Sequence, residues 1–294
     1  MKPRKRPEPR VPYNDLDLTR WREYEELWTD SLWNIPSRAR GNGHALEYHG
    51  NFVPQIATQT FQRFSRVDDV VLDMFLGSGT SAVEALRLGR RCIGVELKPE
   101  LVEHLRGKLA GTEERVAVVC GDSAAPETAT AIRAALSRWE REAADLVMLH
   151  PPYADIIRFS DRPECLSNAG STDAFIEGFA SVARQDYSLL RPGRFAVLVI
   201  GDKYEDGALV PLGFQCMQAM NEAGFRTRSL VVKNIEGNEV GKGRTKNLWR
   251  YRALRGGFYI FKHEYVILFD KPAARPRPRR TATSPSEASP TTEE

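Results

Sequence analysis

Short apolar runs alternate with longer amphipathic stretches over most of the chain. The first apolar run, at 70–75, is followed by a turn with two glycines and then by a helical pattern at about 81–88. This strand–turn–helix order repeats, which is typical of parallel sheets whose strands are joined by helices. Further strands are predicted at 91–97, 116–120, 146–149, 195–200, 228–232 and 258–269, and further helices at 99–109, 126–142, 173–190 and 211–223. The pattern therefore predicts one open α/β domain with about seven strands.

Both ends of the chain differ in composition from this central part. Residues 1–12 and 271–294 are rich in Pro, Arg, Ser, Thr and Glu and contain almost no apolar side chains. Such segments bury too little surface to offset the entropy lost on ordering, so we expect two disordered tails. The domain between them, 13–270, contains two polar insertions, at about 154–172 and 233–257.

Charge is distributed unevenly along the chain. The 294 residues include 42 Lys and Arg against 39 Asp and Glu, and the formal net charge of +3 does not by itself indicate a polyanionic partner. Residues 1–10, 271–294 and 233–255 are all net positive, which leaves an acidic body. In the last of these segments cations alternate with aromatic residues, which suits contact with phosphates and stacking on bases, although a solvated basic loop is the alternative. The candidate nucleic-acid-binding residues are Lys242, Arg244, Lys246, Trp249, Arg250 and Arg252.

The composition also excludes several classes of protein. No run of about 18 apolar residues is present, and the amino-terminal residues lack the apolar segment of a secretory signal. We therefore expect a cytoplasmic protein with no membrane contact. The four cysteines are too widely spaced for a zinc site, so no metal is expected.

A glycine loop joins the first predicted strand to the helix that follows it. Glycines at 77 and 79 allow the backbone to approach a ligand closely, and the helix that follows presents unpaired N–H groups. Residues 77–82 match the G-x-G-x-x-A dinucleotide pattern, and Glu96 ends the next predicted strand, where an acid can bind ribose hydroxyls. The loop predicts a nucleotide-like cofactor and leaves NAD and S-adenosylmethionine both open.

A second motif, His-Pro-Pro-Tyr at 150–153, follows the fourth predicted strand. Open α/β sheets bind their ligands at the carboxyl ends of the strands, so this segment is placed where a substrate would lie. Proline has no N–H, and a rigid proline pair therefore displays backbone carbonyls. A neutral His150 can accept one hydrogen bond in the right tautomer.

The glycine loop resembles the cofactor motif of the S-adenosylmethionine-dependent DNA amino-methyltransferases. Residues 73–80 read D-M-F-L-G-S-G-T, similar to the D-P-F-x-G-S-G-T of that family, with Met74 in place of the proline. The resemblance implies a single Rossmann-like class I methyltransferase domain, with helices on both faces of a mostly parallel sheet and an antiparallel final strand. The implied cofactor-binding residues, which include an upstream segment and an acid after the third strand, are Asn51, Phe52, Pro54, Asp73, Phe75, Gly77, Ser78, Gly79, Thr80, Glu96 and Asp122.

The second motif is similar to the (D/N/S)-P-P-(Y/F/W) signature of the same family. There, the first side chain and the next carbonyl accept hydrogen bonds from the target amine, and the aromatic residue stacks on the flipped base. His150 departs from the signature, which leaves cytosine N4 and adenine N6 both open as targets. The implied catalytic residues are His150, Pro151, Pro152 and Tyr153.

The resemblance implies double-stranded DNA as partner, with a cognate restriction endonuclease if the chain is half of a restriction–modification pair. A nucleoid-associated protein of a prokaryote, phage or mobile element is expected, as a monomer or a homodimer. Cytosine-C5 chemistry is disfavoured because no cysteine follows a proline. The alternatives are an RNA or protein-glutamine N-methyltransferase, an NAD-dependent oxidoreductase and a catalytically silent nucleic-acid-binding module.

Overall fold

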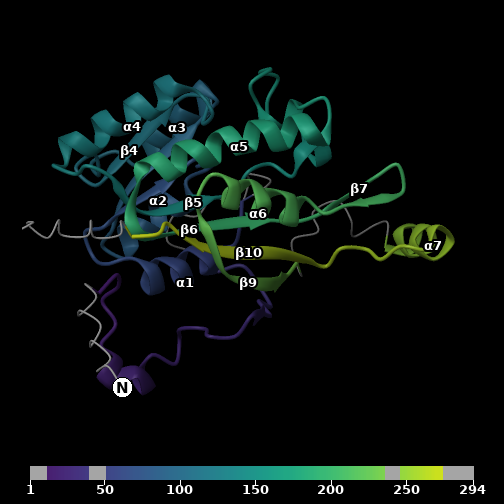
Figure 1. Cartoon of the computed structure of the whole chain (residues 1–294), viewed down its shortest axis with the longest axis horizontal. Coiled ribbons are helices and arrows are strands. Elements are labelled where there is room, and N and C mark those ends of the chain that lie inside the picture. Colours follow the sequence, from purple (N-terminus) through teal and green to yellow (C-terminus); the bar gives the residue numbers. More distant parts are fainter. Residues whose placement is uncertain (1–11, 40–50, 236–245, 274–294) are drawn as a thin grey trace, which may run out of the picture.

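A large twisted sheet forms the centre of the molecule (Figure 1). The computed structural model describes residues 12–39, 51–235 and 246–273. Within these ranges eight strands form one sheet in the order β1-β9-β10-β6-β5-β2-β3-β4. The strands are β1 (Leu32–Trp33), β2 (Val70–Asp73), β3 (Arg91–Glu96), β4 (Val116–Cys120), β5 (Ala144–Leu149), β6 (Leu190–Ile200), β9 (Arg226–Asn234) and β10 (His263–Asp270).

Helices cover both faces of this sheet, with α1 and α5 on opposite sides (Figure 1). Alternate residues of β2 point to opposite faces, so that Val71 packs with α1, α2 and α3 whereas Leu72 packs with α4, α5 and α6. The helices are α1 (Pro54–Phe64), α2 (Thr80–Arg87), α3 (Pro99–Lys108), α4 (Pro126–Arg138), α5 (Thr172–Leu189), α6 (Leu212–Glu222) and α7 (Lys246–Gly256), with short 3-10 helices η1 (Leu18–Glu23), η2 (Ala154–Ile156) and η3 (Leu166–Asn168).

The order and direction of the strands confirm the predicted class I methyltransferase fold. β10 lies between β6 and β9 and is antiparallel to both, as predicted for the final strand. The other neighbouring pairs of this sheet are parallel. From β2 the chain builds toward one edge of the sheet and from β5 toward the other, which makes the β2–β5 pair the topological switch point.

Several predicted boundaries are wrong for identifiable reasons. The apolar run at 258–269 reads as one strand, but β10 begins only at His263, because Phe258 and Phe261 pack against Tyr204 with ring centroids 5.0 and 4.8 Å away. Tyr204 belongs to a hairpin of β7 (Lys203–Glu205) and β8 (Ala208–Val210) that the sequence pattern did not indicate. The predicted helix at 126–142 ends at Arg138, before Glu140, which has a φ of 56°.

Two further expectations need correction or stay open. The basic insertion at 233–257, predicted as a loop, contains helix α7. The sheet has eight strands rather than about seven, because the two residues of β1 pair with β9. Most residues of the predicted tails, 1–11 and 274–294, lie outside the described ranges.

Asp145 links three central strands at their amino-terminal edge. It lies on β5 with an exposed fraction of 1%, and its carboxylate pairs with Arg191 at 2.7 Å and with Arg194 at 3.2 Å, both on β6. The same carboxylate accepts a hydrogen bond of 3.0 Å from the N–H of Val70 on β2. Arg191 is 45% exposed, but Arg194 and the N–H of Val70 are buried, so removing the carboxylate leaves both of them without this partner.

We predict that Asp145→Ala lowers the free energy of unfolding by about 3 kcal/mol, because it breaks a buried ion pair and frees a buried N–H. Urea unfolding followed by circular dichroism measures this loss. Asp161→Ala is the control, since Asp161 pairs with Arg158 at 3.2 Å while 95% exposed, and its effect should stay within about 0.5 kcal/mol. A loss at Asp145 no larger than at Asp161 would contradict the prediction.

Candidate functional site

The glycine loop leaves β2 at the switch point and leads into α2. Gly77 and Gly79 have φ values of 54° and 89°, in the left-handed region that favours glycine. A Cβ on Gly79 would lie 2.8 Å from Cδ2 of Leu105 on α3. The loop is therefore closely packed on one side, and Gly79 is required there by both its conformation and its surroundings.

Glu96 closes this loop from the end of β3, where the sequence placed it. Its Oε2 accepts the N–H of Gly77 at 3.1 Å and its Oε1 accepts the N–H of Lys98 at 2.9 Å. Burial raises the pKa of Glu96 above its ordinary value, against these hydrogen bonds and the charge of Lys98. Each carboxylate oxygen has a second lone pair, so the side chain can still accept hydrogen bonds from the hydroxyls of a ligand.

Asp73 shapes the turn after β2. Its Oδ1 accepts the N–H of Phe75 at 2.8 Å, and the side chain is fully buried. Burial raises the pKa of Asp73 to about 6, although the hydrogen bond from the N–H of Phe75 acts in the opposite direction. This residue therefore organises the backbone of the loop.

Asp122 follows β4 and caps a turn. Its Oδ1 accepts the N–H of Ala124 at 2.9 Å. The hydroxyl of the neighbouring Ser123 donates to the carbonyl of Met74 at 2.5 Å, which ties this turn to the glycine loop. The turn thus lies beside the predicted cofactor loop, and contact of Asp122 with an adenine stays a prediction.

The upstream segment is held against the second motif. Arg38 donates from Nη1 to the carbonyls of Asn51 and Phe52, at 3.2 and 2.8 Å, and Pro54 is the first residue of α1. The ring of Phe52 meets the ring of His150 edge-on, with centroids 5.4 Å apart. In the described part of the chain, Nδ2 of Asn51 is buried without a hydrogen-bond acceptor, which leaves it available to a ligand.

The His-Pro-Pro-Tyr loop begins directly after β5, the parallel neighbour of β2. The N–H of Met74 donates to the carbonyl of Met148 at 3.3 Å, so the two predicted motifs leave adjacent strands at the same edge. Burial lowers the pKa of His150 to about 4, although the charge of Glu264 acts in the opposite direction and that of Lys233 in the same one. His150 is therefore a neutral imidazole at neutral pH.

Tyr153 is part of a chain of polar contacts. Its hydroxyl donates to Oε2 of Glu264 at 2.6 Å and lies 3.4 Å from Nε2 of His150. Oε1 of Glu264 in turn accepts from Nζ of Lys233 at 2.7 Å, with exposed side-chain fractions of 10% and 3%. We call these four residues the polar cluster. Burial and the neighbouring Glu264 carboxylate raise the pKa of Tyr153 well above its ordinary value.

Lys233 and Glu264 are the site residues that sequence reasoning missed. Lys233 was counted with the basic insertion, whereas it lies on β9, buried and paired with Glu264. The two residues are direct partners in the antiparallel β9–β10 ladder. The strand predicted at 228–232 stopped one residue before Lys233, and the predicted final strand began five residues too early, so the two predicted strands did not indicate this contact.

Residues after β6 fasten the second motif from the other side. Lys203 pairs with Asp155 of η2 at 2.7 Å, directly after Tyr153. Asp202 accepts the N–H of Gly213 at 3.0 Å and the hydroxyl of Tyr265 at 2.9 Å. Lys203 thus fastens η2, whereas the bonds of Asp202 join the end of β6 to α6 and β10.

Only part of the predicted nucleic-acid contact can be placed. Lys242 and Arg244 lie outside the described residues, and Lys246 and Trp249 belong to α7 without a described side chain. Arg250 and Arg252 are exposed on α7, which lies at the far end of the molecule beyond β7 (Figure 1). The hydroxyl of Tyr204 donates to the carbonyl of Tyr259 at 3.0 Å, which links the segment after α7 to the hairpin.

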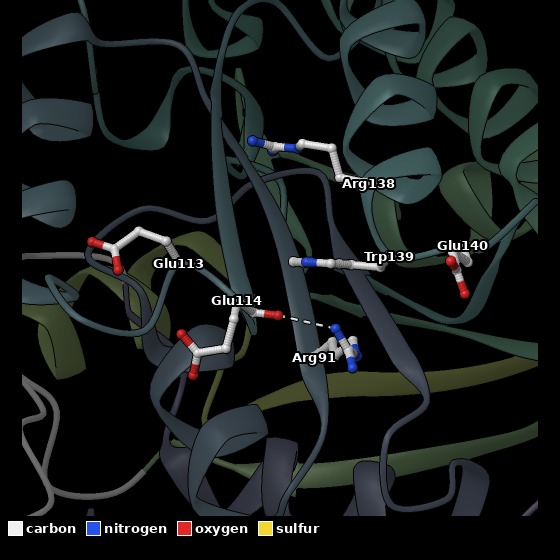
Figure 2. A pocket seen from close by; sticks show the side chains of 6 residues that line it. All are labelled: Arg91, Glu113, Glu114, Arg138, Trp139 and Glu140. Atoms are coloured by element: carbon white, nitrogen blue, oxygen red, sulfur yellow. Dashed lines mark hydrogen bonds between the residues drawn. The ribbon is translucent and has the colours of Figure 1, made fainter.

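A hollow on the opposite edge of the sheet is separate from this site (Figure 2). It lies at the start of β3, where Arg91 stacks over Trp139 at 5.5 Å and donates to the carbonyl of Glu114 at 2.9 Å. None of the predicted site residues lines it. Its lining residues are Arg91, Glu113, Glu114, Arg138, Trp139 and Glu140.

Residues 2–106 match the family described as DNA methylase, and residues 57–170 match one described as Conserved hypothetical protein 95. The predicted resemblance to DNA amino-methyltransferases is confirmed over the first segment. That segment contains the upstream residues, the glycine loop and Glu96. It ends before the His-Pro-Pro-Tyr loop, so the role of that loop depends on its own motif and geometry.

Two relatives are type II methyltransferases of Methanocaldococcus jannaschii. M.MjaII is 36% identical over 95 residues, which are 30% of this chain and 18% of that protein. M.MjaI is 27% identical over 95 residues, 32% of this chain and 31% of that protein. The matched region thus spans less than a third of either relative. Among solved structures, TrmN from Thermus thermophilus aligns over 76% of this chain and 50% of that one, with 16% identity and a TM-score of 0.47.

These methyltransferase matches support S-adenosylmethionine, rather than NAD, as the cofactor of the glycine loop. The loop fits such a group: Gly79 has no Cβ, Glu96 retains free lone pairs, and the amide of Asn51 is a buried donor without an acceptor among the described residues. None of the helices in the described ranges is both long and apolar enough to cross a membrane.

We predict that Gly79→Ala weakens the binding of S-adenosylmethionine at least about tenfold, because the new Cβ must sit 2.8 Å from Leu105 on a backbone with a φ of 89°. Calorimetric titration measures the affinity. Gly107→Ala on α3 is the matched control, since a Cβ there meets nothing within 4 Å. If both variants bind as the wild type does, the glycine loop has been assigned wrongly.

Proposed function

We propose that this chain transfers a methyl group from S-adenosylmethionine to the exocyclic amine of a base in double-stranded DNA, at cytosine N4 or adenine N6. The observation that carries this proposal is the meeting of two loops on adjacent strands: the glycine loop after β2 and the His-Pro-Pro-Tyr loop after β5. Support comes from the DNA methylase match of residues 2–106 and from the type II methyltransferase relatives.

The chemistry requires orientation more than acid or base strength. The lone pair of an exocyclic amine is delocalised into the base, so the amine is a weak nucleophile. Two acceptors that hold its N–H groups, the neutral ring of His150 and the carbonyl of Pro151, would turn that lone pair toward the cofactor. S-adenosylmethionine, when bound, supplies the activated methyl group on its sulfonium.

Tyr153 would form a wall of the pocket for a flipped base. Its hydroxyl is bonded to Glu264, and its ring passes so close to Gly201 that a Cβ there would lie 2.9 Å from it. The ring is thus held firmly from one side. A rigid aromatic side chain suits stacking, because little entropy is lost when the base binds.

The substrate class needs a direct experiment, because the matched relatives cover the chain only in part. The wild-type protein would be incubated with labelled S-adenosylmethionine and, separately, duplex DNA, RNA and a protein mixture. The products would be digested and the methylated nucleoside identified by mass. N4-methylcytosine or N6-methyladenine from DNA supports the proposal, and label in RNA or protein alone overturns it in favour of the alternatives.

The remaining partners are part of the proposal and depend on the same assay. We propose that the chain acts in the nucleoid and that a cognate restriction endonuclease accompanies it if methylation is site-specific. Resistance of the methylated duplex to cleavage would identify that endonuclease. Monomer and homodimer both stay open as the state in which it acts.

We predict that His150→Ala lowers kcat for DNA methylation by about 10²- to 10³-fold, because one of two acceptors for the target amine is lost. The affinity for S-adenosylmethionine should stay near that of the wild type, since the glycine loop is unchanged. Single-turnover methylation and calorimetric titration measure the two quantities. His104→Ala, at an exposed position of α3, controls for the removal of an imidazole; full activity in both variants would exclude His150 from catalysis.

We predict that Arg250→Ala combined with Arg252→Ala weakens DNA binding and lowers the slope of log K against log[salt] by about 2, because each arginine contacts one phosphate. Fluorescence anisotropy at several salt concentrations measures this slope. The charge-matched control is Arg133→Ala with Arg138→Ala, two exposed residues of α4, a helix that lies far from α7 (Figure 1). An unchanged slope in the α7 variant would remove that helix from the DNA interface.

A further inference from the structure

The polar cluster contains an ordered series of donors and acceptors that ends at His150. Nζ of Lys233 lies 2.7 Å from Oε1 of Glu264, and Oε2 of Glu264 lies 2.6 Å from the hydroxyl of Tyr153. That hydroxyl lies 3.4 Å from Nε2 of His150. The four residues come from β9, β10 and the loop after β5, so tertiary structure alone brings them together.

The number of protons on each group decides which one donates and which one accepts in each hydrogen bond of the series. Lysine only donates, and a carboxylate held in an ion pair only accepts. The hydroxyl of Tyr153 has one proton, and it donates that proton to Glu264. Toward His150 the phenolic oxygen therefore has only a lone pair to offer, so a hydrogen bond between them requires the proton to be on Nε2.

A neutral imidazole carries one ring proton, so a proton on Nε2 leaves Nδ1 as an acceptor. The burial that lowers the pKa of His150 keeps the ring neutral. Among the described residues no group donates to Nδ1, and Nδ1 is not one of the buried unpaired atoms of this part of the chain. Its lone pair therefore has no donor in this part of the chain and can accept one from a bound molecule.

We infer that Lys233 and Glu264 are positioning residues that act through Tyr153 to hold His150 in its Nε2–H tautomer, with Nδ1 turned into the acceptor for the target amine. This inference rests on the proposed function for its last step. It assigns a role to two side chains beyond the motif itself, Lys233 and Glu264, and it explains how histidine can occupy the first place of that motif. In the opposite tautomer an N–H of the ring would face an N–H of the amine, and the bond would be lost.

A purely structural role for the ion pair is the competing explanation. Lys233 and Glu264 are direct partners in the β9–β10 ladder and could serve only to hold those strands together. A structural role predicts changes in stability when the pair is altered, without any effect on the position of the proton in the ring of His150. The position of that proton is therefore the decisive measurement.

The first experiment is nitrogen-15 NMR of the full chain with labelled histidine, without DNA. Long-range proton–nitrogen correlations distinguish the two neutral tautomers, and the signals of His150 are identified by their loss in His150→Gln. We expect the Nε2–H pattern for His150. The Nδ1–H pattern would overturn the inference whether or not the chain methylates DNA, and the Nε2–H pattern without any methyl transfer would leave the tautomer assignment standing while the proposed function fails.

The second experiment changes one acceptor. In Glu264→Gln the amide can donate to the oxygen of Tyr153, so the phenol proton turns toward Nε2 of His150 and the Nδ1–H form gains population. We expect kcat to fall at least about tenfold with the KM for S-adenosylmethionine unchanged. If the Glu264→Gln variant does not fold, Tyr153→Phe removes the same constraint and should give a mixture of tautomers. An unchanged tautomer in a folded variant would overturn the inference.

Tyr265→Phe is the matched control. The hydroxyl of Tyr265 also donates to a carboxylate, Oδ2 of Asp202 at 2.9 Å, and also lies near an imidazole, 3.2 Å from Nε2 of His263. It occupies β10 one residue after Glu264, but its hydroxyl bonds to Asp202 rather than to the polar cluster. Both kcat and the tautomer of His150 should equal those of the wild type, and a shift here would attribute the effect to general loosening of β10.

Discussion

The parallel pairing of β2 with β5 determines where every other part of the site lies. Val71 is opposite Leu146 and Asp73 opposite Met148, so the two strands end at the same level of the sheet. From this pair the chain builds outward in both directions, and ligands of open α/β sheets bind at such a point. The glycine loop and the His-Pro-Pro-Tyr loop therefore meet at one edge, although about 70 residues separate them in the sequence.

Burial gives the polar groups at this edge properties that they lack in water. It raises the pKa of Asp73 and Glu96 and lowers that of His150, so carboxyl groups hold protons more strongly while the imidazole holds its second proton more weakly. A neutral histidine is useful here, because an imidazolium has no acceptor to offer an amine. The packing that excludes water around Phe52 and His150 thus has a direct chemical consequence.

The sequence pattern predicted the features that depend on residues close together in the chain. The alternation of strands and helices, the glycine turn and the position of Glu96 follow from spacing within one or two strand–helix units, and all three appear in the structure. Lys233 and Glu264 could not be found in that way, because they lie 31 residues apart and Glu264 lies 111 residues from Tyr153. The aromatic run before β10 also misled the prediction, since Phe258 and Phe261 pack on Tyr204 of the β7–β8 hairpin, which the sequence pattern did not indicate.

The direction of β10 explains how Glu264, distant in the sequence, reaches the two motifs that local patterns predicted. The first residues of a parallel strand lie at the opposite edge of the sheet, as do Arg91 of β3 and Asp145 of β5. Because β10 is antiparallel, its second residue, Glu264, lies beside the carboxyl ends of β6 and β9. There it bonds to Lys233 of β9 and to Tyr153 of the loop after β5. The antiparallel strand thus places a carboxylate from near its start at the edge where the two motifs lie. Pairing with β6 and β9 on either side fixes the position of this carboxylate. The antiparallel β10 is characteristic of the topology of this fold, and it also allows the Lys233–Glu264 pair to hold Tyr153.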